Sequence, residues 1–197
     1  MRRVSVIGGS CTGKTTTSRE LARRLGVPHI ELDALHHDAG WQEAPAEVLQ
    51  ERVRAALEGA PDGWVADGNY HGKIGTFVLE RADTVVFLDL PFWLTLRRVV
   101  WRTLSRIVTR EELWNGNRES LQLALSRDSI IWWVVTHHGE YREKWPERYE
   151  ALPHLRVVRL HSPREVREFV QSIQATDSMS GSSKGSELQK TPPFVET

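Results

Sequence analysis

The segment GGSCTGKTT near the start of the chain constrains the fold more than any other feature. It fits the pattern G-x-x-x-x-G-K-[ST], with Gly8, Gly13, Lys14 and Thr15 at the defining positions. An apolar run, RRVSVIG, leads into it and a helical pattern follows, which is the strand, loop and helix context that the pattern requires. The sequence therefore predicts a loop that binds a nucleoside triphosphate, rather than a glycine-rich turn that matches by chance.

The chemistry of phosphate binding explains these residue types. Glycines let the chain turn tightly, so that the backbone N–H groups of residues 9–15 point at phosphate oxygens at the positive end of a helix. We expect Lys14 to neutralise the β- and γ-phosphates and Thr15 to bind Mg²⁺ through its hydroxyl, so the predicted cofactors are ATP and Mg²⁺. The predicted binding residues are Gly8, Gly9, Ser10, Cys11, Thr12, Gly13, Lys14, Thr15 and Thr16. Cys11 is either a small residue tolerated in the loop or a reactive, redox-sensing thiol.

Five apolar runs separated by helix-length segments indicate an α/β fold. The runs are RRVSVIG, PHIEL, GWVADG, DTVVFLDL and LRVVRL. Three of them are almost continuously apolar, which is typical of parallel strands covered by helices on both faces. A length of 197 residues, 40% of them hydrophobic, fits one domain over residues 1–174. Residues 175–197 are rich in Ser, Gly, Thr, Lys and Pro and are expected to be a disordered tail.

Two helices are predicted between these runs. Pro45 can open the first, which carries an apolar stripe and ends at Gly59. The stripe consists of Leu49, Val53, Ala56 and Leu57. The second helix runs from about Trp93 to Ile107 and places apolar side chains on one side and arginines on the other. The apolar side holds Leu96, Val100, Thr103, Leu104 and Ile107, and the other holds Arg98, Arg102 and Arg106. This pattern predicts that Leu104 contributes to stability.

Positive charge is concentrated in one part of a chain whose formal net charge is zero. Residues 97–127 contain seven arginines and three acidic residues, a local balance of +4. Phosphoryl transfer needs such cations to neutralise the charge on the transferred group. We expect this region to form a helical lid in which Arg102 and Arg106 are catalytic, although a solvated helix face would show the same composition.

Four segments in order, GGSCTGKTT, ELDAL, WVADGNY and VVFLDLP, resemble the adenylate kinase and shikimate kinase group. More closely, the chain resembles the bacterial adenylate kinase-related proteins known as DNA topology modulation proteins. The resemblance covers about residues 3–170. It implies a three-layer P-loop kinase fold, with a five-stranded parallel sheet of order 2-3-1-4-5, a helical lid and an acceptor-side insert.

Carboxylates follow two of the predicted strands. Asp67 ends the third run, where it can reach Mg²⁺ through a water, or it forms an Asx turn ahead of Gly68. Glu31 and Asp33 follow the second run; the similar D-x-D element of the related kinases supplies a Mg²⁺-side carboxylate and a substrate-orienting base. Here Glu31 replaces the first, and Asp33 is the predicted catalytic base unless it merely caps the next segment.

Aromatic and imidazole side chains supply further candidates. Asn69, Tyr70 and Trp41 are candidates for the acceptor pocket. The pairs His36-His37 and His137-His138 invite a zinc site, but adjacent histidines lack the i, i+4 helical spacing and no cysteine joins them. We therefore expect no metal other than Mg²⁺.

The sequence favours a cytoplasmic kinase that phosphorylates a small-molecule acceptor, either a hydroxyl compound or a nucleotide. The alternative is an NTP-binding regulatory module that contacts a protein partner through its tail. Zero net charge disfavours a nucleic-acid partner, and no apolar span or leader suggests a membrane or export.

Overall fold

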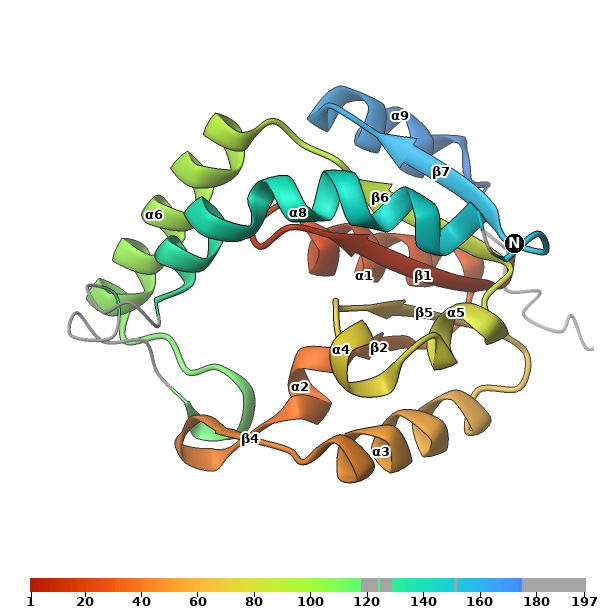
Figure 1. Cartoon of the computed structure of the whole chain (residues 1–197), viewed down its shortest axis with the longest axis horizontal. Helices are drawn as coiled ribbons and strands as arrows, with labels where there is room; N and C mark the ends of the chain where they lie inside the picture. The colour runs from red at the N-terminus through yellow and green to blue at the C-terminus, as the bar shows by residue number, and fades with distance from the viewer. Residues whose placement is uncertain (118–123, 125–128, 151, 175–197) are drawn as a thin grey trace, which may run out of the picture.

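A five-stranded parallel sheet forms the centre of the molecule in the computed structural model (Figure 1). The structure describes residues 1–117, 124, 129–150 and 152–174, without the side chains of residues 140–148 and 150. The strands of this sheet are β1 (Arg3–Gly8), β2 (His29–Glu31), β5 (Trp64–Asp67), β6 (Thr84–Leu88) and β7 (Arg156–Leu160). They lie in the order β2-β5-β1-β6-β7, which is 2-3-1-4-5 when these five are counted along the chain. The predicted α/β class and parallel sheet are confirmed, and the predicted tail lies outside the described residues.

Helices fill the segments between the strands. The longer ones are α1 (Lys14–Leu25), α3 (Ala46–Glu58), α6 (Phe92–Thr109), α8 (Ile130–Glu150) and α9 (Pro163–Ser172). The shorter ones are α2 (Leu32–His36), α4 (His71–Ile74) and α5 (Phe77–Arg81). Two 3₁₀ turns, η1 (Ala39–Trp41) and η2 (Trp114–Gly116), accompany a small hairpin of β3 (His37–Asp38) and β4 (Gln42–Glu43). As predicted, α3 begins beside Pro45 and ends at Gly59. None of the described helices has the length and apolar character needed to cross a bilayer.

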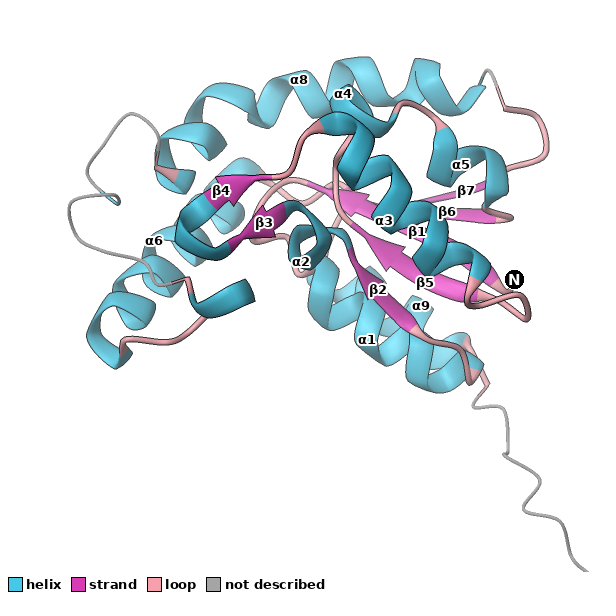
Figure 2. Ribbon diagram, turned by 90° about the horizontal axis from the view of Figure 1, so that it is seen from below, coloured by secondary structure: helices cyan, strands magenta, loops and turns pink. Residues whose placement is uncertain are grey.

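Side chains alternate between the two faces of the sheet. Figure 2 shows α1 and α9 on one side of the sheet and α4 and α8 on the other. Val4 and Val6 of β1 belong to the cluster that packs against α1 and α9. Ile7 belongs instead to the cluster on the opposite face, because successive strand residues point to opposite sides. The nearly continuous apolar runs of β1 and β6 therefore reflect strands buried on both faces. The run in β7 does not, because β7 is an edge strand and its Val157 is 45% exposed.

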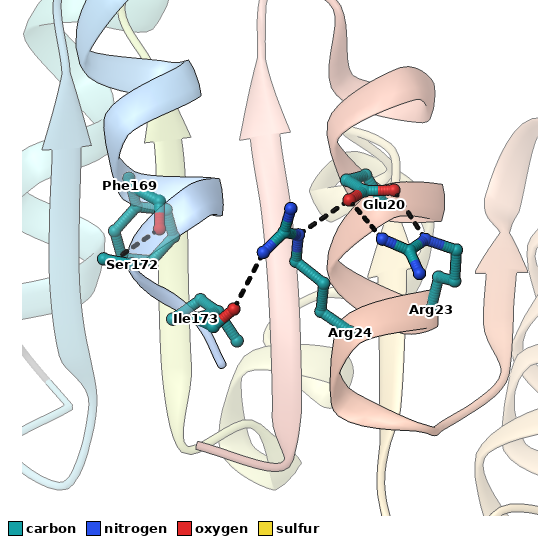
Figure 3. A network of polar contacts seen from close by, with 6 residues as sticks. All are labelled: Glu20, Arg23, Arg24, Phe169, Ser172 and Ile173. Carbon is teal, nitrogen blue, oxygen red and sulfur yellow. Dashed lines mark hydrogen bonds and ion pairs between the residues drawn. The ribbon is translucent and has the colours of Figure 1, made fainter. Parts of the chain in front are cut away.

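Polar contacts join α1 to the end of α9 (Figure 3). Glu20 accepts hydrogen bonds from Arg23 and Arg24, which lower its pKa to about 2. Arg24 also donates to the carbonyl oxygen of Ile173 at 3.0 Å. One arginine thus connects helices that are far apart in the sequence, at the end of α1 away from the GGSCTGKTT loop.

The expectation that Leu104 of α6 contributes to stability is not supported. Thr95, Val99 and Thr103 are the buried residues of this helix, whereas Leu104 is 49% exposed. The arginines of the predicted stripe, Arg98, Arg102 and Arg106, are partly buried next to this inner face. An open hollow of about 340 Å³ lies on the outer face instead, lined by Trp93, Leu96, Arg97, Val100 and Trp101. The charged side of α6 therefore faces the molecule, and an apolar side faces outward.

Trp64 provides a test of the core. It is 2% exposed in the cluster that joins the β2–β5 edge to α3, α4 and α5. Because truncation leaves a large cavity, we expect Trp64→Ala to lower the free energy of unfolding by about 3–5 kcal/mol in urea denaturation. Trp101→Ala is the matched control: Trp101 is 75% exposed, so its loss should change stability by less than about 0.5 kcal/mol. Equal losses in the two variants would contradict the packing described.

Candidate phosphate-binding and acceptor site

The carboxyl ends of four strands bring the predicted site residues together. Gly8 ends β1 opposite Leu88 of β6, while Val6 of β1 is in register with Asp67 of β5, and Asp67 with Glu31 of β2. In open parallel sheets ligands bind at this edge, outside the ends of the strands. The GGSCTGKTT loop crosses the same edge and leads into α1 at Lys14. Residues that are far apart in the sequence are therefore held around one place.

Gly8 lets this loop lie close to the neighbouring strand. Its φ is 151°, and a Cβ atom there would lie 2.8 Å from the carbonyl oxygen of Leu88 and 2.9 Å from Thr12 Oγ1. Gly13 has a φ of 99° and precedes α1. Thr12 is buried and its hydroxyl donates to the carbonyl oxygen of Gly9 at 2.9 Å. The conformation of the loop thus depends on a glycine at each of its two ends.

The remaining loop positions are less enclosed than Gly8 and Thr12. Cys11 is half-buried with a φ of 60°, and Ser10 is also half-buried. Thr16 is exposed on the first turn of α1. These positions are consistent with a loop whose backbone, more than its side chains, faces a ligand.

The Lys14 ammonium is held by the loop itself. Its Nζ donates to the carbonyl oxygens of Gly8 and Gly9 at 3.0 and 2.9 Å. Desolvation lowers the pKa of Lys14, and the negative charges of Asp33 and Asp67 oppose this effect, Asp33 more strongly. The positive charge of Arg102 also acts on Lys14 and lowers its pKa. Lys14 therefore lies where the loop, the two carboxylates and α6 come together.

Asp67 connects the loop to the sheet. It is 3% exposed, and its Oδ2 accepts a hydrogen bond of 2.7 Å from the hydroxyl of Thr15. Its Oδ1 lies 2.9 Å from Nε2 of His29, a residue that the sequence reasoning missed. The Asp67 carboxylate thus has two partners, a hydroxyl of the loop and a histidine of the neighbouring strand β2.

Glu31 and Asp33 have different partners although only one residue separates them. Glu31 forms an ion pair with Arg19 of α1 at 3.2 Å. Asp33 lies in the first turn of α2, where no side chain caps the helix, and its Oδ1 accepts a hydrogen bond of 2.6 Å from the hydroxyl of Tyr70. Asp33 is therefore not the cap of the following segment. Burial and the nearby Asp33 raise the pKa of Tyr70, so its hydroxyl remains a donor.

Asn69 supports the loop. Its Nδ2 donates to the carbonyl oxygen of Gly8 at 2.5 Å, and its Oδ1 accepts from the Gly8 N–H at 3.4 Å. The predicted role of Asn69 was in the acceptor pocket. In the structure the side chain is bound to the phosphate-loop backbone, beside Tyr70, which reaches Asp33.

The arginines of α6 differ in their contacts. Arg98 donates to the carbonyl oxygen of Thr12 at 3.2 Å, and so touches the loop directly. The Nε of Arg102 is buried and has no hydrogen-bond partner among the described residues. Arg106 forms an ion pair with Glu111 at 3.4 Å. Arg98 thus contacts the phosphate loop, and the charge of Arg102 acts on Lys14 within that loop. Of these two, only Arg102 was predicted to be catalytic.

Rings continue from Tyr70 away from Asp33. The ring of His36 lies 4.5 Å from that of Tyr70 and 4.6 Å from that of His37. His37 in turn stacks on Trp114 at 5.7 Å and meets the edge of Trp41 at 5.6 Å. We call these five residues the ring cluster.

The described residues contain no group of three or more His, Cys, Asp or Glu side chains that could hold a metal ion.

Two asparagines fasten the ring cluster to the segment after α6. Asn117 is 3% exposed; its Oδ1 accepts from the Trp41 N–H at 2.8 Å and its Nδ2 donates to the Asp38 carbonyl at 3.0 Å. Asn115 donates to the carbonyl oxygen of His37 at 2.5 Å. Sequence reasoning missed both asparagines. Their partners lie 76 to 79 positions away, so no local pattern could have shown them.

A second buried carboxylate, also missed, lies at the end of β6. Asp89 is 3% exposed and its Oδ2 lies 2.8 Å from Nη2 of Arg159 and 3.1 Å from Nδ1 of His161. The FLDLP segment contained this residue, but Arg159 and His161 are brought to it only by the pairing of β6 with β7. This cluster fixes the strand ends on the far side of the loop from Asp33.

Known structures support the fold. No protein-family model matches the chain, and no curated protein sequence matches it either. The shikimate kinase from Bacteroides thetaiotaomicron is 17% identical, with a TM-score of 0.50, over 87% of this chain and 95% of that one. The shikimate kinase from Acinetobacter baumannii, solved with shikimate, is 16% identical, with a TM-score of 0.54, over 88% and 90%. The chain thus has the P-loop kinase fold of these structures.

Proposed function

We propose that this protein is an ATP- and Mg²⁺-dependent phosphotransferase that transfers the γ-phosphoryl group to a small-molecule hydroxyl. The observation that carries this proposal is the position of Asp33. Asp33 lies just after β2 and accepts a hydrogen bond from Tyr70, whose neighbour Asn69 bonds to Gly8 of the phosphate loop. A base candidate therefore lies close to the loop. The shikimate kinases of similar fold, one solved with shikimate, favour a small-molecule acceptor. The closer relationship to DNA topology modulation proteins rests on the four sequence segments alone.

The transfer step assigns a role to each group. The acceptor oxygen forms a bond to the γ-phosphorus while the bond from that phosphorus to the β–γ bridging oxygen breaks, and ADP leaves with the electron pair. The hydroxyl proton passes to the Asp33 carboxylate, which acts as general base. Lys14 neutralises the charge on the phosphates, and its bonds to the Gly8 and Gly9 carbonyls hold the ammonium at the loop before nucleotide binds.

The residues near Thr15 fit Mg²⁺. Thr15 and Asp67 offer a hydroxyl and a carboxylate oxygen that are 2.7 Å apart, and Mg²⁺ prefers oxygen ligands. A site with so few protein ligands is expected, since Mg²⁺ keeps several waters and also binds the phosphates. When bound, the ion would neutralise phosphate charge; Thr15 would hold it directly, and Asp67 through a water.

The inner face of α6 supplies the cations of the proposed lid. The Arg102 Nε is a buried donor without a described partner, which is costly unless a ligand accepts its hydrogen bond. Arg106 would have to exchange Glu111 for phosphate to act in the same way. We therefore assign the larger catalytic role to Arg102. The segment from α2 to β4, with the ring cluster, is the proposed acceptor-side insert.

A regulatory NTP-binding module is the second candidate. It would retain the same phosphate loop but use the bound nucleotide to control a protein partner through residues 175–197, which lie outside the described residues. Asp33 would then have no proton to accept. The position of this carboxylate beside Lys14 favours the kinase.

The proposal predicts acceptor-dependent consumption of ATP. ADP formation is to be measured against a panel of sugars, polyols, nucleosides and nucleotides, with the product identified by mass. Lys14→Ala should abolish transfer while circular dichroism shows an intact fold, because the lysine neutralises charge in the transition state. ATP hydrolysis that no acceptor stimulates would favour the regulatory module.

Asp33→Asn tests the base. If the acceptor is a hydroxyl, we expect kcat to fall by about 10² to 10⁴ while the Kd for ATP changes little. Asp62→Asn is the control, since Asp62 is exposed and precedes β5 at the opposite edge of the sheet. An unchanged kcat with a raised acceptor KM would reject the base and indicate a nucleotide acceptor, whose anionic oxygen needs no deprotonation.

The α6 arginines provide a graded test. Arg102→Ala should lower kcat by about 10² or more, because it removes a guanidinium, with a buried and unpartnered Nε among the described residues, that would neutralise charge on the transferred phosphoryl group. Arg106→Ala should lower it less, since Arg106 already has Glu111 as a partner. Neither change should alter the melting temperature by more than Leu104→Ala, which truncates a half-exposed side chain. Equal rates for the wild type and Arg102→Ala would contradict the assignment.

A further inference from the structure

We propose that the acceptor is an uncharged hydroxyl compound, an inference that rests on the proposed function. It concerns the acceptor side, which we define as residues 29–45 and 67–75 around Asp33. Among the residues that the structure describes, the cations that bond to this region are used by its own carboxylates. A second phosphate or a carboxylate on the acceptor would need a guanidinium or ammonium group left for it.

Three ion pairs carry this point. Lys73 Nζ lies 2.7 Å from Glu43 Oε2. Arg52 reaches both oxygens of Asp38, at 2.9 and 3.3 Å, and its Nη1 also donates to the carbonyl oxygen of Leu35. Arg19 pairs with Glu31 at 3.2 Å. Each of these cations would have to leave a carboxylate, and so expose a new negative charge, in order to bind an anionic acceptor.

On the acceptor side, the groups that contact Asp33 and its partner Tyr70 are neutral. Its carboxylate accepts a hydrogen bond from the Tyr70 hydroxyl, whose pKa is raised by burial and by Asp33 itself. His36 is 3% exposed, and its pKa is lowered mainly by burial and further by Lys73 and His37, so its ring is uncharged at neutral pH. The proposed function assigns the Lys14 ammonium, on which the charge of Asp33 acts, to the phosphates of ATP. An acceptor anion close to Asp33 would therefore be repelled with little compensation from the acceptor side itself.

The ring cluster offers what a hydroxyl compound needs. The Nδ1 atoms of His36 and His37 are buried and have no hydrogen-bond partner among the described residues. A neutral imidazole nitrogen can donate to or accept from a hydroxyl, depending on the tautomer. Trp41 and Trp114, whose rings contact that of His37, add the kind of aromatic surface on which the C–H face of a carbon ring packs. Apart from its paired charges, the acceptor side thus offers neutral hydrogen-bonding groups and ring surfaces.

Charge fractionation tests the inference even while the acceptor is unidentified. A small-molecule extract is separated by anion exchange into an unbound fraction, which holds uncharged compounds, and a retained fraction of anions. ADP formation from ATP is then measured with each fraction. We expect stimulation by the unbound fraction. Stimulation only by the retained fraction would overturn the inference and leave the kinase function intact, whereas stimulation by neither, with ATP still bound, would contradict the proposed function itself.

Matched pairs then measure the discrimination. The pairs are glucose and gluconate, thymidine and its monophosphate, and methyl shikimate and shikimate, which differ mainly in charge. For any pair with turnover, kcat/KM should be at least about tenfold higher for the neutral member, a difference of about 1.4 kcal/mol. A higher value for the anionic member would overturn the inference.

Glu43→Gln should weaken this discrimination, because it releases the Lys73 ammonium next to His36 and Tyr70. We expect kcat/KM for the anionic member to rise severalfold, with no similar rise for the neutral one. The double variant Glu43→Gln/Lys73→Gln is the matched control: it lacks both charges and should show no gain. An equal gain in the single and double variants would show that the pair does not set acceptor charge.

Discussion

The Lys14 ammonium must keep both its position and its charge near other cations before a phosphate binds. Much of the surrounding structure meets this requirement. Two backbone carbonyls bind its hydrogens, and two carboxylates, Asp33 and Asp67, oppose the desolvation that would otherwise remove its charge. These carbonyls can lie there because Gly8 approaches β6 more closely than any residue with a side chain could. The sheet order supplies the rest, since it places the ends of β2 and β5 beside β1.

The same requirement explains the unusual orientation of α6. An amphipathic helix normally turns its apolar side inward and its charges outward. Here Arg98 and Arg102 face the phosphate loop, so Trp93 and Trp101 remain on the outer surface, each 75% exposed. The helix gives up apolar burial in order to place guanidinium groups beside a site for anions. Local departures of this kind are expected where function and folding make opposite demands.

Sequence reasoning found the features that have a local cause. The five strands and the limits of α3 follow from apolar runs and from Pro45 and Gly59, and the loop follows from its motif. It failed for α6, because periodicity shows two sides of a helix but not which side meets the core. It also missed His29, Asp89 and Asn117, whose roles depend on partners 38 to 79 positions away. Such pairs arise from strand order and loop packing, which no window of sequence contains.

The central place of β1 has a consequence for biosynthesis. This strand leaves the ribosome before both of its partner strands, which begin only at Trp64 and Thr84. At typical elongation rates, its apolar segment VSVI waits on the order of ten seconds before both neighbours exist. A short β-prone segment left unpaired for so long is a hazard for aggregation. The yield of native protein should therefore depend on how the nascent chain is shielded, even though the finished sheet buries this segment on both faces.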